Sequence, residues 1–226
     1  MPSPDPAVLR HNPFVTTQQS ETEQVASAIA EHAHDGFALV AIDGPGGAGK
    51  STLATTLGEA LGGAERTTIV RGDDFYRPMA PEERLLLSPE EGYHQYFDWQ
   101  RLRDQVLIPL LAGQAADYQR YDWPTAALAT DELHHVPRSG TVIVEGVFTA
   151  RPELANYYDL TVCVETPRDT CLHRQHTRGH DHGPGNWIGR WRAAEEHYLA
   201  ATRLSPESAG SDTDRRVIRR QVPLLV

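Results

Sequence analysis

The stretch FALVAIDGPGGAGKS, residues 37–51, decides the fold. Its first seven residues form a near-continuous apolar run, which is typical of a strand buried on both faces of a parallel sheet. Residues 44–49 then form a glycine-dense turn, and residues 50–61 have helical character. A strand, a glycine-rich turn and a helix in this order are the context that a phosphate-binding loop requires.

The turn also matches the motif GxxxxGK[ST] in full, from Gly44 to Ser51. Glycines let backbone N–H groups curl around phosphate oxygens, and the dipole of the following helix attracts the same anion. Lys50 is expected to reach the β- and γ-phosphates of ATP, and the Ser51 hydroxyl to ligate Mg²⁺. Lys50 is the only lysine in the chain, beside 20 arginines, which argues against a chance match. The residues expected at the nucleotide are Gly44, Pro45, Gly46, Gly47, Ala48, Gly49, Lys50, Ser51 and Thr52.

Short apolar segments alternate with helical ones along the rest of the chain. Strands are expected at 67–71, 141–145, 160–164 and 217–222, and helices at 17–34, 99–111, 168–178 and 187–203. Residues 78–98 are polar and are expected to be irregular with a short helix. This alternation predicts an α/β P-loop NTPase fold, with a parallel β-sheet flanked by helices. We expect a loose N-terminal leader over 1–16 and a single P-loop domain over 17–226, with a helical lid at about 173–192.

Composition excludes several classes of function. The 226 residues carry a formal charge of −10, whereas binding of a nucleic-acid backbone needs a basic face. No apolar run approaches the length of a membrane-spanning helix, and the first residues lack the pattern of a signal peptide. Cys163 and Cys171 form no disulfide framework. We therefore expect a cytoplasmic protein with a small-molecule substrate and with no nucleic-acid or membrane partner.

A phosphate loop alone leaves kinases, GTPases and motor-type ATPases open. No lysine follows Lys50, so the guanine-reading motif N-K-x-D of GTPases is impossible here. Asp73 and Asp74 end the strand at 67–71, at the sheet edge where open α/β folds bind ligands. A carboxylate there can accept the proton of a substrate hydroxyl or hold Mg²⁺. Because consecutive side chains leaving a strand point to opposite sides, we predict that only one of the two faces the γ-phosphate.

Six motifs together resemble the uridine kinase-like P-loop kinases, a group related to phosphoribulokinase and bacterial pantothenate kinase. In chain order they are GPGGAGKS, DDFYRP, YFDW, RYDW, VIVEGVF and DTCLHRQHTR, and the resemblance covers about residues 37–200. It implies transfer of the γ-phosphate of ATP to a hydroxyl of a small metabolite. The acceptor that the resemblance favours is a nucleoside such as uridine or cytidine.

The resemblance also implies roles for individual residues. Asp73, first in its motif, corresponds to the general base, which leaves Asp74 without a catalytic role. Lys50 and Arg178 are the further catalytic candidates. Glu145 joins Ser51 near the Mg²⁺. The expected substrate-binding residues are Tyr76, Asp98, Tyr121, Arg174 and Arg178, with the aromatic rings at the base, Asp98 at the ribose hydroxyls and the arginines in the lid.

Three points stay open. After Tyr121 the chain has no histidine before His134, where pyrimidine-reading relatives carry one, so pantothenate, glycerate, a sugar or a sugar phosphate remain alternative acceptors. A non-kinase NTP-binding switch is the alternative from another class, and a homo-oligomer is possible in either case. His173, His176, His180 and His182 are close enough in sequence for a metal, although a lid without metal is the expected structure. Trp187 and Trp191, four residues apart, are expected on one helix face.

Overall fold

The computed structural model describes residues 13–178, 186–202 and 216–221. Its centre is a five-stranded sheet of order β2-β7-β1-β8-β9, in which each neighbouring pair is parallel. The strands are β1 (Phe37–Asp43), β2 (Thr67–Arg71), β7 (Gly140–Glu145), β8 (Leu160–Glu165) and β9 (Arg216–Gln221). The predicted parallel sheet is confirmed, and the first two strands have the predicted bounds.

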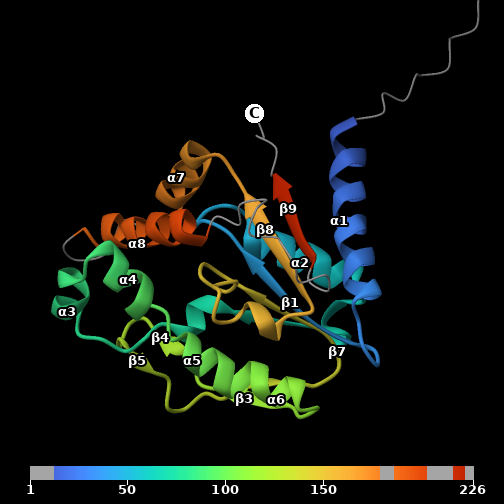
Figure 1. Cartoon of the computed structure of the whole chain (residues 1–226), viewed down its shortest axis with the longest axis horizontal. Coiled ribbons are helices and arrows are strands. Elements are labelled where there is room, and N and C mark those ends of the chain that lie inside the picture. Colours follow the sequence, from blue (N-terminus) through green and yellow to red (C-terminus); the bar gives the residue numbers. More distant parts are fainter. Residues whose placement is uncertain (1–12, 179–185, 203–215, 222–226) are drawn as a thin grey trace, which may run out of the picture.

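Helices cover both faces of this sheet (Figure 1). The long helices are α1 (Pro13–Glu31), α2 (Lys50–Ala60), α7 (Arg168–Thr177) and α8 (Trp187–Thr202). Short 3-10 turns lie at η1 (Gly63–Glu65), η2 (Gly72–Phe75) and η4 (Ala155–Tyr157). Helices α1 and α2 pack on one face, and α8 lies over the other together with the segment that joins β2 to β7.

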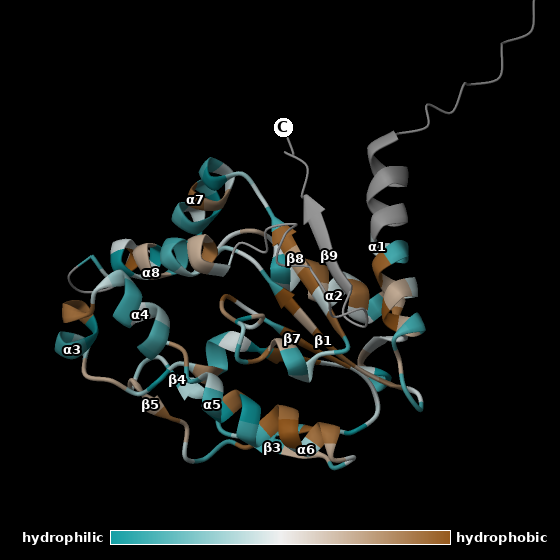
Figure 2. Ribbon diagram, in the orientation of Figure 1, coloured by the Kyte–Doolittle hydropathy of each residue, from teal (hydrophilic) through white to brown (hydrophobic). Residues whose placement is uncertain are grey.

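Strand β1 supplies apolar side chains to two separate cores, because its residues alternate between the faces of the sheet. Ala38, Val40 and Ile42 belong to the core beneath α1 and α2, whereas Leu39 and Ala41 belong to the core on the opposite face. All seven residues of β1 are buried. The apolar strands in the middle of Figure 2 are therefore covered on both sides, as the unbroken apolar run predicts.

The segment between β2 and β7 forms a wall beside the sheet. Its helices are α3 (Pro81–Leu86), α4 (Pro89–Gln95), α5 (Trp99–Leu102) and α6 (Ile108–Leu111), with a π-helical turn η3 (Arg103–Leu107) that makes the last two continuous. The short strands are β3 (Ala116–Tyr118), β4 (Tyr121–Asp122), β5 (Ala127–Leu128) and β6 (His134–Val136), paired antiparallel as β3–β6 and β4–β5. The predicted helix over 99–111 is confirmed.

The structure differs from the prediction in one helix boundary and in the number of short helices. Helix α1 begins at Pro13, so the leader predicted over 1–16 is too long by four residues; residues 1–12 lie outside the described part. Proline is favoured at a first helical position because its missing N–H would have no partner there. Residues 78–98 hold two short helices instead of one. The second is set by a capping box, in which Ser88 and Glu91 exchange side-chain and backbone hydrogen bonds.

Candidate active site

The phosphate loop joins the carboxyl end of β1 to the first turn of α2. Gly44, Gly47 and Gly49 have φ values of 149°, 82° and 102°, a range that favours glycine. A Cβ at Gly47 would lie 2.5 Å from the carbonyl oxygen of Cys171 in α7. Glycine is therefore required both by the turn and by the close approach of a neighbouring helix.

The predicted loop residues divide into two groups. Gly46, Gly47, Gly49, Lys50, Ser51 and Thr52 line a cavity of about 790 Å³. Gly44, Pro45 and Ala48 lie behind that surface and hold the turn, in which the Ala48 N–H donates to the Pro45 carbonyl over 3.0 Å. The backbone N–H groups at the start of α2 are the anion-binding part of such a loop.

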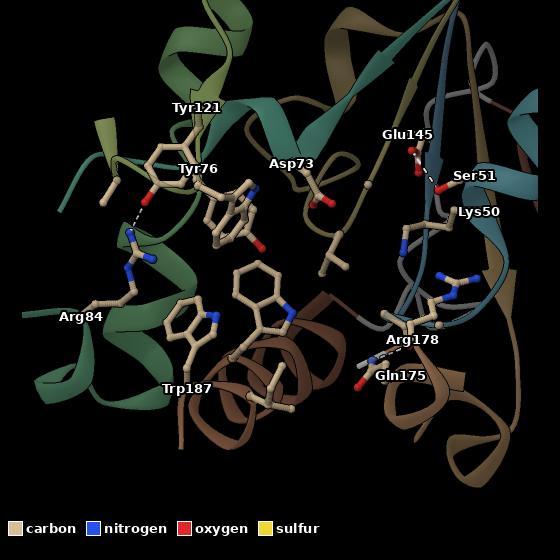
Figure 3. A pocket seen from close by; sticks show the side chains of 18 of the residues that line it. Lys50, Ser51, Asp73, Tyr76, Arg84, Tyr121, Glu145, Gln175, Arg178 and Trp187 are labelled. Atoms are coloured by element: carbon tan, nitrogen blue, oxygen red, sulfur yellow. Dashed lines mark hydrogen bonds between the residues drawn. The ribbon is translucent and has the colours of Figure 1, made fainter. Parts of the chain in front are cut away.

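Lys50 lies at the mouth of the loop with only 8% of its surface exposed. Its Nζ donates to the carbonyl oxygens of Gly44 at 2.8 Å and of Pro45 at 3.0 Å. Figure 3 shows its amine directed into the cavity, on the side that also carries Ser51, Glu145 and Arg178. The single ammonium group of the chain therefore faces the place where a phosphate would lie.

Ser51 and Glu145 come together because β1 and β7 are neighbours in the sheet. The register pairs Ile42 with Glu145, and Ser51 Oγ donates to Glu145 Oε1 over 3.0 Å. Burial raises the pKa of the Glu145 carboxyl, which Lys50 and the Ser51 hydroxyl oppose. A hydroxyl and a carboxylate are the hard oxygen ligands that Mg²⁺ prefers, so the donor set fits the predicted metal.

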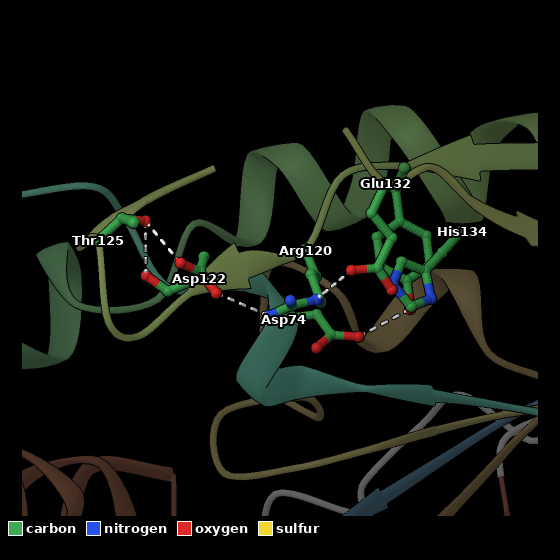
Figure 4. A network of polar contacts seen from close by, with 7 residues as sticks. Asp74, Arg120, Asp122, Thr125, Glu132 and His134 are labelled. Carbon is green, nitrogen blue, oxygen red and sulfur yellow. Dashed lines mark hydrogen bonds and ion pairs between the residues drawn. The ribbon is translucent and has the colours of Figure 1, made fainter. Parts of the chain in front are cut away.

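Asp73 and Asp74 diverge within the 3-10 turn η2, which directly follows β2. Asp73 lines the cavity, and Figure 3 shows its carboxyl directed toward the side of Lys50. Asp74 points away and accepts the Tyr118 hydroxyl over 2.8 Å. Figure 4 shows Asp74 beside the polar network of the small strands. The two carboxylates therefore face different surroundings, and the structure places the predicted base in the cavity.

Aromatic rings form the other end of the cavity. Tyr76 lies between three of them, with ring centroids 5.8 Å from Tyr121, 4.5 Å from Trp123 and 5.1 Å from Trp191. Burial, together with the charge of Asp73, raises the pKa of Tyr76 well above its usual range, so its hydroxyl stays neutral. The further lining residues at this end are Pro81, Arg84, Leu85, Pro124, Ala126, Trp187 and Ile188. Both tryptophans of α8 thus line the cavity as well as packing together, with centroids 6.0 Å apart.

Helices α7 and α8 hold the phosphate loop from outside. Gln175 Nε2 donates to the Gly46 carbonyl over 2.7 Å, and Glu195 Oε2 accepts the Gly46 N–H over 2.9 Å. Arg174 donates to the Gly47 carbonyl over 3.3 Å. Of the two arginines predicted to bind substrate, Arg178 lines the cavity and Arg174 lies against the loop. The predicted lid includes residues 179–185, which lie outside the described part of the chain.

Asp98 lies outside the residues that line the cavity, although the resemblance places it at the hydroxyls of a ribose. Its carboxylate caps α5 by accepting the Arg101 N–H over 3.2 Å, and it lies 3.7 Å from Arg77 and 3.9 Å from the Arg101 guanidinium. Asp is a strong N-cap residue, so the position has a structural explanation.

Several residues of the site were not predicted. Glu195 lies on a helix far along the chain from the loop it contacts, and no motif marks it. Gln175 lies within the motif DTCLHRQHTR, but the resemblance gave it no role. Arg84 lies between two of the recognised motifs. The described residues contain no group of three or more histidine, cysteine, aspartate or glutamate side chains that could hold a metal ion. Of the four clustered histidines, His180 and His182 lie outside the described residues.

Asp43, the last residue of β1, connects the loop to α8. Its carboxylate accepts the N–H groups of Gly44 and Ala150 and the Tyr198 hydroxyl, the last over 2.7 Å. Burial raises the pKa of this carboxyl despite those hydrogen bonds and the nearby charge of Lys50. The conformation of the loop therefore depends on contacts made by three separate elements.

A phosphate loop after β1, carboxylates just past β2 and at the end of β7, and one cavity that joins them define a P-loop kinase. The model of the phosphoribulokinase / uridine kinase family matches residues 39–183. The chain therefore belongs to this family, and it is an ATP-dependent kinase that acts on a hydroxyl group. Membership decides against the alternative of a non-kinase switch.

Individual relatives are distant. A uridine kinase of Shewanella denitrificans is 28% identical over 149 residues, which are 62% of this chain and 68% of that protein. A solved structure described as a possible uridine kinase of Bacillus stearothermophilus is similar with a TM-score of 0.63 and 21% identity, over 88% of this chain and 98% of that one. D-glycerate 3-kinase of Cryptococcus neoformans is similar with a TM-score of 0.56 and 14% identity, over 88% and 96%. These structural likenesses show the fold. Within the described residues, no helix is both long enough and apolar enough to span a membrane.

Proposed function

We propose that the chain transfers the γ-phosphate of Mg²⁺-bound ATP to the 5′-hydroxyl of a nucleoside such as uridine or cytidine. The observation that carries this proposal is one cavity with two different ends. Lys50, Ser51, Asp73 and Glu145 line its polar end, and a group of aromatic rings lines the other. Aromatic side chains favour a flat ring as partner, and uridine kinases are among the relatives.

In this mechanism Asp73 accepts the proton of the acceptor hydroxyl as its oxygen attacks the γ-phosphorus. The bond between that phosphorus and the bridging oxygen of ADP breaks as the new bond forms. Lys50 and Arg178 place positive charge beside the phosphate oxygens, where charge changes during transfer. Ser51 and Glu145 would hold Mg²⁺, which would supply positive charge to the phosphate groups when bound. The protein contributes positioning and charge, and forms no covalent bond to the substrate.

A second group of acceptors is favoured by the position of Asp98. This carboxylate caps α5 and does not line the cavity, so the side chain that the resemblance places at the ribose hydroxyls is engaged by its own helix. Pantothenate, glycerate, a sugar or a sugar phosphate therefore stay in the proposal as alternative acceptors. A cytoplasmic location also remains a prediction; within the described residues, Cys163 and Cys171 are not joined in a disulfide.

The test is a screen for phosphorylated product by mass spectrometry. Nucleosides, pantothenate, glycerate, sugars and sugar phosphates are each incubated with the protein, ATP and Mg²⁺. The Asp73→Asn variant serves as the control for residual activity of any contaminating kinase. We expect product from uridine or cytidine, and a loss of at least about 100-fold in the control. Product from a different acceptor alone would replace the nucleoside by that compound and leave the kinase chemistry in place.

A further inference from the structure

Arg84 lies at the aromatic end of the cavity, away from the phosphate loop (Figure 3). Its Nη2 donates to the Tyr121 hydroxyl over 2.7 Å, and its Cζ lies 5.0 Å from the ring centroid of Trp187. The backbone of the same residue is also fixed, because Tyr96 donates its hydroxyl to the Arg84 carbonyl over 3.1 Å. The guanidinium is thus held in one place by a hydrogen bond and a cation–π contact.

Among the described residues the charge of Arg84 has no carboxylate partner, because every ion pair there involves other side chains, and Tyr121 is the hydrogen-bond partner of the Arg84 guanidinium. An arginine side chain carries five N–H donors and no acceptor. A guanidinium in a cavity wall therefore has donors left for a ligand.

Tyr121 extends this donor surface. It is 1% exposed, and because its oxygen accepts from Arg84, its own proton is left for another acceptor. The short hairpin that carries it is fixed from both sides: Arg120 pairs with Asp122 at 3.2 Å and with Glu132 at 2.7 Å (Figure 4). The Tyr121 proton and the remaining Arg84 N–H groups are therefore hydrogen-bond donors, on a rigid support, at the same end of the cavity.

We propose that Arg84 and Tyr121 determine acceptor specificity by binding an oxygen that only accepts hydrogen bonds, at the end of the acceptor opposite its reacting hydroxyl. This inference rests on the proposed function for the position of the reacting hydroxyl at Asp73. A ring carbonyl and a carboxylate share the required chemistry. An amino group or an alcohol at the same place would leave donors facing donors, or charge unpaired, which a binding site penalises strongly. Within the nucleosides, the pair selects the 4-oxo ring of uridine over the 4-amino ring of cytidine.

The experiment compares acceptors that differ only in this group. The matched pairs are uridine with cytidine, pantothenate with its alcohol analogue, and glycerate with glycerol. For each pair, kcat and KM are measured with Mg²⁺ and ATP for the wild type and for Arg84→Met, which keeps a chain that can pack on Trp187 and removes charge and donors. Tyr121→Phe removes one hydroxyl and keeps the ring. Arg103→Met is the control, because Arg103 pairs with the adjacent Asp104 and does not line the cavity.

We expect the wild type to favour the oxo or carboxylate member by about 10–100-fold in kcat/KM, the effect of a hydrogen bond to a charged group. Arg84→Met should remove this preference, mainly through the acceptor KM, and leave the KM for ATP within about twofold. Tyr121→Phe should reduce the preference in part, which also guards against a folding defect of the first variant. Arg103→Met should behave as the wild type.

The outcomes separate the two proposals. Turnover of uridine and cytidine at equal rates, unchanged in Arg84→Met, would overturn the inference and leave the nucleoside function standing. Selective turnover of a carboxylate acceptor, lost in Arg84→Met, would support the inference and remove the nucleoside. A preference for the amino or alcohol member would overturn the inference. Absence of product from all six compounds would overturn both.

Discussion

Replacing Asp73 or Asp74 by asparagine should separate an effect on catalysis from an effect on stability. Asp73 is exposed and lines the cavity, so Asp73→Asn removes a proton acceptor from the cavity wall. A positioned base contributes about 10²–10⁴ in rate, which is about 2.7–5.4 kcal/mol of transition-state stabilisation. We therefore expect kcat to fall by that factor, while the melting temperature stays within about 2 °C, since surface substitutions change stability by about 0.5 kcal/mol or less.

Asp74→Asn should lower the stability of the protein and leave its kcat nearly unchanged. Its carboxylate accepts the hydroxyl of Tyr118, which is 4% exposed, over 2.8 Å. The amide oxygen of asparagine can still accept that hydrogen bond, but without charge assistance, so the loss is about 1–1.5 kcal/mol. For a chain of this size that corresponds to a fall of about 2–6 °C in melting temperature. The kcat should remain within about threefold of the wild type.

The assay is steady-state turnover with the best acceptor, combined with thermal unfolding and with nucleotide affinity by calorimetry. Nucleotide affinity should be nearly unchanged in both variants, because neither side chain belongs to the phosphate loop. An active Asp73→Asn beside an inactive, thermally unaltered Asp74→Asn would refute the reasoning from their positions in the cavity wall.

Three further predictions follow from single contacts. Lys50→Ala should lower kcat by about 10²–10³, since it removes the charge beside the γ-phosphate; near-normal turnover would exclude the assigned role of the loop. Asp98→Ala should lower the unfolding free energy by about 1 kcal/mol through loss of the N-cap and leave the acceptor KM within about twofold; a tenfold rise in that KM at unchanged stability would restore its role at the substrate. Burial raises the pKa of Glu195, so the folded state binds this proton more tightly and stability falls as pH rises above the range in which glutamate ordinarily titrates. Glu195→Gln should reduce that slope by up to about 1.4 kcal/mol per pH unit, measured by denaturant unfolding at several pH values; an identical slope in the variant would show that Glu195 does not contribute.

Local sequence was sufficient for the elements that carry the nucleotide site. The apolar run at Phe37–Asp43 and the motif that follows it predicted β1, the phosphate loop and α2, because strand burial, glycine conformation and helix capping act within a few residues. The same holds for β2 and for Asp73, which the order of the motifs placed at the edge of the sheet. The capping box at Ser88 is a signal of the same short range.

The acceptor end of the cavity depended on tertiary structure. Arg84, Tyr121 and Trp187 come from three elements, and only the packing of the wall against α8 brings them together. Asp98 shows the opposite case: a residue in a matching motif whose side chain is taken by the helix it caps. Glu195 is fixed by a bond to Gly46, 149 positions away in the chain. A sequence pattern reports the preferences of neighbours along the chain, whereas the direction of a side chain, and the charge that faces it, depends on which distant elements fold against it.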